Sequence, residues 1–146
     1  MPRAVLTSLL ALALLAAPSA RAESPPPGSP PSREAVAEKS GLAWLRLVDA
    51  GNYADSWAES ADMFRSALSQ VRWVEGLRAS RAPLGVAASR TVTNRTYSAQ
   101  LAGLPSGEYV VLGIATDFAA RKKATEILTL RLERDAHWRV AGYLIR

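Results

Sequence analysis

The stretch WLRLVDAGNYADSWAESADMFRSALSQVRWVEGLRASRAPLGVAASR, residues 44–90, decides the fold of this chain. Apolar residues recur in it at helical spacing, interrupted by glycine at Gly51 and by proline and glycine at 83–85. We expect one helix to end at Gly51, a short helix over 52–59, and helical structure over 61–80. The pattern does not decide whether 61–80 is one helix or two helices with a break at Ser69.

Upstream of this stretch, Ser32 can cap the first helix, because a serine side chain accepts a hydrogen bond from a free backbone N–H of the first turn. An apolar stripe then follows at helical spacing. We expect it to contain the core-facing residues of the helix: Val36, Ala43 and Leu47, with Trp44 and Val48 beside them.

Downstream of residue 85 the period of the apolar pattern changes from 3.6 to 2, which indicates strands. We expect strands over 90–97, 108–118, 124–134 and 137–146, the second of them central because it is almost wholly apolar. In the last strand Trp138, Val140 and Leu144 should point inward. Helices followed by a meander predict an α+β fold: N-terminal helices on one face of a curved antiparallel sheet of about four strands.

The N-terminus has the pattern of a secretory signal over 1–22. It combines Arg3, an apolar run too short to span a bilayer comfortably, and small residues before a cleavage point after Ala22. Residues 23–33 read as a proline-rich linker, and 34–146 as a single α+β domain. We therefore expect a periplasmic or secreted protein with no stable membrane insertion after the signal is removed.

Composition narrows the classes of function. The chain carries a net charge of +5, and losing Arg3 and Arg21 with the signal leaves +3, which is too small and too dispersed to indicate a nucleic-acid partner. The chain contains no cysteine, which excludes disulfides, thiol chemistry and thiolate metal sites, so stability must come from an ordinary core. Abundant alanine, arginine and leucine are typical of a GC-rich bacterial genome.

Several segments resemble the bacterial domain-of-unknown-function family 4019, whose members are exported and uncharacterised. The resemblance rests on WLRLVDAGNYADSW at 44–57, WVEGLRASRAPLG at 73–85, LPSGEYVVL at 104–112, EILTL at 126–130 and HWRVAGYLIR at 137–146. It implies export and the general fold, but no reaction. The order of elements also resembles a cystatin-like or NTF2-like roll.

No established catalytic motif is present, and we expect no catalytic residues, no cofactor and no metal site. The single histidine, His137, has no second imidazole or cysteine to share a metal with, so a surface strand position is its default interpretation.

Six residues could line a cavity between helices and sheet: Tyr53, Trp57, Trp73, Arg81, Arg90 and Tyr109. Aromatic walls with arginines suit an anionic or planar ligand. The competing interpretation is that the aromatics form the core and that the arginines bind backbone carbonyls around the turn at 83–85, or pair with Asp49 or Glu108.

We therefore expect a non-enzymatic binding or interaction module that uses a helix–sheet cavity or a sheet face, with an unknown small molecule or protein as partner. A homodimer is compatible with this, and exposure of Tyr109, Val111 and Ile127 on the sheet would favour it. The alternative is a small isomerase-like or hydrolase-like enzyme with Asp49 or Asp55 as general base and Tyr53 or Tyr109 as hydrogen-bond donor.

Overall fold

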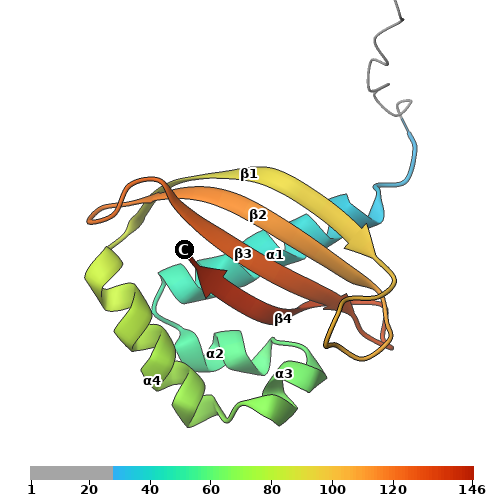
Figure 1. Cartoon of the computed structure of the whole chain (residues 1–146), viewed down its shortest axis with the longest axis horizontal. Coiled ribbons are helices and arrows are strands. Elements are labelled where there is room, and N and C mark those ends of the chain that lie inside the picture. Colours follow the sequence, from blue (N-terminus) through green and yellow to red (C-terminus); the bar gives the residue numbers. More distant parts are fainter. Residues whose placement is uncertain (1–27) are drawn as a thin grey trace, which may run out of the picture.

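The computed structural model describes residues 28–146; the expected signal peptide and the linker up to residue 27 lie outside the described residues. Figure 1 shows one long helix across the sheet and three shorter helices beyond one of its edges. The elements are α1 (Arg33–Asp49), α2 (Tyr53–Ala58), α3 (Asp62–Ala67), α4 (Gln70–Arg81), the 3₁₀ turn η1 (Ala82–Leu84), β1 (Ala87–Ser98), β2 (Tyr109–Phe118), β3 (Ala124–Leu132) and β4 (Trp138–Ile145). Over the described range, none of the helices has the length and apolar character needed to cross a bilayer.

Helix α1 begins as predicted, with the Ser32 side chain accepting a hydrogen bond from the backbone N–H of Ala35. Its buried face, however, consists of Ala37, Gly41, Trp44, Leu45 and Val48. The predicted stripe was therefore wrong in its first members: Val36 is 39% exposed and Ala43 is also exposed.

Gly41 explains why the buried face of α1 differs from the predicted stripe. A Cβ there would stand 3.2 Å from methyl carbons of Leu112 and Leu128 in the sheet, tighter than ordinary contacts. The helix therefore presents its smallest residue where it comes nearest the strands, and the face around Gly41 becomes the core face. A stripe counted from bulky residues alone cannot find such a close approach.

Region 61–80 forms two helices, which settles the question that the pattern left open. Leu68 adopts an extended conformation, with φ −139° and ψ 123°, and ends α3. Ser69 then caps α4 by accepting from the N–H of Arg72 at 3.5 Å. Ser69, where the pattern left a break undecided, is thus the cap of the second helix.

Two buried serines fix the helices against one another. The indole N–H of Trp44 in α1 donates to the Ser56 carbonyl at 2.7 Å, and that of Trp73 in α4 donates to Ser56 Oγ at 2.9 Å. Ser60 Oγ donates to the same Ser56 carbonyl. Because buried indole N–H groups need acceptors, α2 serves as the polar spacer between α1 and α4.

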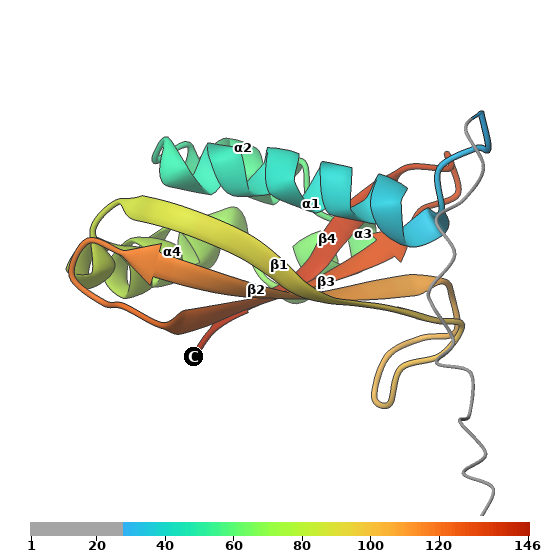
Figure 2. The same ribbon diagram turned by 90° about the horizontal axis from the view of Figure 1, so that it is seen from above.

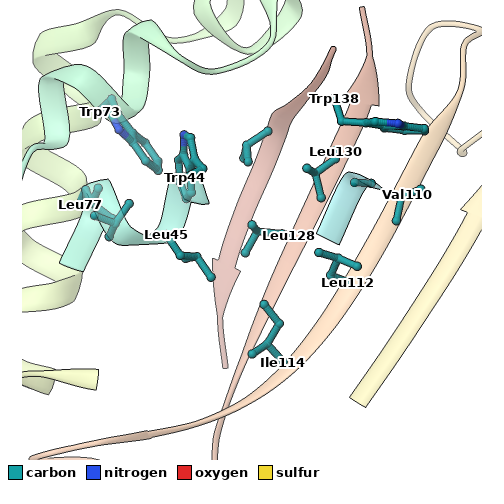
Figure 3. Packing of buried hydrophobic residues seen from close by; sticks show 13 residues of the cluster. Trp44, Leu45, Trp73, Leu77, Val110, Leu112, Ile114, Leu128, Leu130 and Trp138 are labelled. Atoms are coloured by element: carbon teal, nitrogen blue, oxygen red, sulfur yellow. The ribbon is translucent and has the colours of Figure 1, made fainter. Parts of the chain in front are cut away.

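The sheet is an antiparallel meander in the order β1-β2-β3-β4, as predicted, with the apolar β2 in the interior. Figure 2 shows α1 on one side of the twisted sheet and the β1–β2 loop on the other. The shared core lies between α1, α4 and the facing strand residues (Figure 3). Its strand members are Val110, Leu112, Ile114, Leu128, Leu130, Trp138 and Val140. The predicted α+β fold, with helices on one face, is confirmed.

The last strand corrects one prediction. Trp138 and Val140 are buried as expected, but Leu144 is 45% exposed. The pairing of β3 with β4 shifts register next to Thr129, so one extra residue of β4 is inserted there. A bulge reverses the alternation beyond it, and Tyr143 takes the inward position instead.

Candidate functional site

Two regions between the helices and the sheet collect the residues of interest. The first, which we call the charge cluster, consists of Asp49, Arg81, Arg90, Thr116, Glu126 and Tyr143. The second, which we call the α4–β4 groove, is an open depression of about 340 Å³ between helix α4 and strand β4. Its lining residues are Leu68, Arg72, Trp73, Gly76, Leu77, Ser80, Tyr143, Leu144 and Ile145.

The two predicted arginines meet in the charge cluster. Arg81 stands at the end of α4 and Arg90 near the start of β1. Arg81 donates to Asp49 at 2.8 Å, and Arg90 donates to both oxygens of the same carboxylate. Of the structural alternatives that the sequence left open for the arginines, pairing with Asp49 is therefore the one present.

Glu126 is the second carboxylate of the cluster and is fully buried. Arg90 Nε donates to it at 2.5 Å, Thr116 at 2.6 Å and the Tyr143 hydroxyl at 2.5 Å. Arg81 completes the cluster at 3.5 Å from Glu126, with its guanidinium 4.7 Å from the centre of the Phe118 ring. Two carboxylates thus face two guanidinium groups, so the charges of the cluster balance.

The electrostatics of the cluster follow from this geometry. Burial by itself would raise the pKa of Glu126, but hydrogen bonds from Arg90, Thr116 and Tyr143 outweigh it and hold that pKa below the ordinary 4.5. Burial and the neighbouring Glu126 charge raise the pKa of the Tyr143 hydroxyl, so it stays protonated and remains a donor. Burial would lower the pKa of Arg90, but its bonds to Asp49 and Glu126 raise it.

The carboxylates of the cluster are held in ion pairs. Both oxygens of Asp49 and both oxygens of Glu126 accept hydrogen bonds from cationic or hydroxyl donors. Glu126 is also fully buried, and Asp49 is bonded to two arginines at once. Chemically, the cluster ties the ends of α1 and α4 to β1 and β3.

The remaining predicted site residues lie apart from the cluster. Trp73 is buried in the core, with its ring centre 5.0 Å from that of Phe64, and also lines the groove. Trp57 and Tyr53 are half-buried against the core, and the Trp57 indole donates to the Leu68 carbonyl at 2.7 Å. The structure therefore brings Arg81 and Arg90 together, and Trp73 to the groove, but does not gather all six around one cavity.

Tyr109 is fully buried, and its hydroxyl donates to the Pro105 carbonyl at 2.6 Å. It begins β2, whereas Thr116 of the cluster lies seven positions further on, about 23 Å along an extended strand. Tyr109 and Asp49 therefore do not share a site. Asp55 is exposed in α2. On the outer sheet face Val111 and Ile127 are half-buried.

Three members of the cluster were missed by the sequence reasoning: Thr116, Glu126 and Tyr143. Glu126 precedes Leu128, Leu130 and Leu132 at intervals of two, so the predicted strand alternation, continued back by one step, places it on the core face. That signal was available. Tyr143 faces inward only because of the bulge in β4, for which the sequence carries no clear sign.

A second depression, of about 650 Å³, lies beside the β3–β4 hairpin. Charged side chains dominate its lining, and those of Arg65 and Arg139 already pair with Asp62 and Asp135. Within residues 28–146 there is no group of three or more histidine and acidic side chains that could hold a metal ion.

A family model described as "Protein of unknown function (DUF4019)" matches residues 40–143. The match confirms the resemblance seen in the sequence. It includes every member of the charge cluster and all lining residues of the groove except Leu144 and Ile145. No match was found among the curated proteins.

Proposed function

The chain belongs to the DUF4019 family, and from the geometry of its helix–sheet layer we propose that it is a non-enzymatic binding module that holds an apolar ligand in the α4–β4 groove. Trp73, Leu77 and Tyr143 form the floor and sides of this groove. Its volume lies at the lower end of the range for ligand pockets.

The main support for the proposal is the presence of a glycine, Gly76, where helix α4 lines the groove. It lies in the interior of α4, where glycine costs about 0.5–1 kcal/mol relative to alanine. A Cβ at this position would meet no atom within 4 Å, so neither crowding nor a positive φ requires glycine there. The helix therefore carries a destabilising residue that adds no side chain to the lining of the groove.

The neighbouring helical positions support this interpretation. Residues 72, 76 and 80 follow one another at intervals of four and therefore lie along one side of α4. Gly76 and Ser80 are small, and Arg72 brings a positive charge to one end of the groove. A ligand with an apolar body and a negative or polar end would match this pattern.

The test is a fluorescence titration of the purified protein with the apolar anionic dye anilinonaphthalene sulfonate. We expect the wild type and Gly76→Ala to bind the dye and Gly76→Phe to lose it, because a ring at this position fills the groove. Circular dichroism checks that all three proteins are equally folded. Equal dye binding by Gly76→Phe would contradict the proposal.

We also propose that the module acts in the periplasm or outside the cell after cleavage following Ala22. The support is the signal pattern of residues 1–22 together with the proline-rich segment that follows it. The intact mass of the protein from a periplasmic extract should correspond to a chain beginning at Glu23. A cytoplasmic protein that retains Met1 or Pro2 would refute export.

A further inference from the structure

We propose that the ligand of the α4–β4 groove is an extended peptide segment that adds to β4 as a fifth strand. The inference rests on the proposed function, because it names the class of ligand for the same groove. Two features lie side by side there: an open sheet edge that offers backbone hydrogen bonds, and an apolar helix face that can take side chains.

The backbone of β4 shows which groups are open. β4 is an edge strand, paired only with β3. At its far end Thr125 and Arg146 exchange both backbone hydrogen bonds, at 2.9 and 2.8 Å. In an antiparallel ladder the bonded pairs alternate, so Leu144 also bonds to β3, whereas the N–H and C=O groups of Tyr143 and Ile145 point away from it.

The first half of the same edge is already used by the chain itself. The N–H of Ala61, between α2 and α3, donates to the Val140 carbonyl at 2.8 Å. Beyond the bulge, no backbone hydrogen bond from elsewhere in residues 28–146 reaches the outward groups of Tyr143 or Ile145. The open part of the edge is thus the part that borders the groove.

The spacing of the open groups specifies an extended polypeptide. Tyr143 and Ile145 are two positions apart in a strand, about 6.8 Å, which is the repeat of a paired strand. A strand lying in register would find two donors and two acceptors. Its side chains would alternate, one set contacting Trp73 and Leu77 and the other facing solvent.

The test uses three versions of one probe, the peptide acetyl-EVTVTVE-amide: unmodified, N-methylated at the valines, and N-methylated at the threonines. Successive N–H groups of a strand point to opposite edges, so each methylated version blocks only one edge. We expect one methylated version to bind like the unmodified peptide and the other to bind about tenfold more weakly or worse. Amide hydrogen exchange of Tyr143 and Ile145 should slow only with the peptides that bind.

Gly76→Phe should abolish peptide binding, whereas Val71→Lys should not, because Val71 is 66% exposed on α4 and does not line the groove. Equal affinity of the two methylated versions, or binding without protection of Tyr143 and Ile145, would overturn the inference.

Further outcomes separate the inference from the proposed function. Dye binding that depends on Gly76, with no peptide binding up to about 1 mM, would overturn the peptide inference and leave the apolar groove standing. Protection of Tyr143 and Ile145 in a dimer without peptide would assign the edge to a second copy of the chain and overturn the inference. Loss of both dye and peptide binding would remove the proposed function as well.

Discussion

The charge cluster and the α4–β4 groove lie in the same helix–sheet layer and share Tyr143, yet they differ in how far their polar groups are satisfied. In the cluster, Asp49 and Glu126 have all four carboxylate oxygens bonded. In the groove, the outward backbone groups of Tyr143 and Ile145 have no backbone partner among the described residues. The Tyr143 hydroxyl belongs to the charge cluster, whereas the backbone N–H and C=O of the same residue border the α4–β4 groove.

The comparison shows how structural residues can be told from binding residues in a chain without catalytic motifs. Charged residues in an interior attract a functional interpretation, but a balanced and fully bonded set is explained by its role in holding elements together. Unpaired backbone groups at a sheet edge stay open to a further strand, and at β4 they lie beside an apolar hollow. We therefore assign stability to the cluster and binding to the groove, and the following predictions test this division.

The largest effect should come from Glu126→Leu. Removing the buried carboxylate leaves Arg90 and Arg81 without one of their two partners, and breaking a buried pair costs about 3–5 kcal/mol of unfolding free energy. Urea unfolding followed by tryptophan fluorescence measures this. The control is Glu75→Leu at an exposed position of α4, which should change stability by less than about 0.5 kcal/mol.

A cost below about 1 kcal/mol for Glu126→Leu would mean that the cluster is dispensable for stability. The assignment of stability to the charge cluster would then be wrong, and a functional role for its charges would have to be considered instead.

Part of the unfolding free energy that Glu126 contributes should depend on pH, and this effect should be smaller than that of Glu126→Leu. Because the folded protein holds the pKa of Glu126 below 4.5, its contribution is complete above that value and is lost as pH falls through the lower, folded-state pKa. The wild type should therefore lose stability below about pH 4.5 more steeply than Glu126→Gln, which cannot ionise at this position. Parallel profiles of unfolding free energy from pH 7 to 3 would contradict the assigned pKa.

The smallest effect has the opposite sign and belongs to the groove. Gly76→Ala should raise the unfolding free energy by about 0.5–1 kcal/mol, because alanine favours the helix and its methyl group meets no atom within 4 Å. Thermal unfolding measures the gain. A loss of stability would show that the glycine serves the fold, and would withdraw the main support for a functional hollow.

Much of the fold could be predicted because its signals are local. Ser32 and Ser69 cap helices, Gly51 follows the end of α1, and the change of period after residue 85 marks the meander. The core face of α1 and the inward residues at the end of β4 could not be predicted. A close helix–sheet contact at Gly41 sets the first, and a bulge in β4 sets the second. Both are tertiary effects without a sequence period.

The candidate site was predicted in part for the same reason. Residue type singled out Arg81 and Arg90 and left Asp49 and Glu108 as alternative partners, but it did not indicate that Glu126 pairs with both arginines. The groove was harder still, because it depends on the absence of a side chain at Gly76 and on backbone groups of β4. A sequence pattern built from chemically conspicuous side chains does not register either feature.

The most direct test of the account is amide chemical-shift mapping of the ¹⁵N-labelled protein during titration with anilinonaphthalene sulfonate. We predict the largest shifts at Gly76 and Leu77 in α4 and at Tyr143 and Ile145 in β4, with the outer sheet face unchanged. Shifts concentrated instead at Val111 and Ile127 would place binding on the outer sheet face and contradict the assignment of the groove.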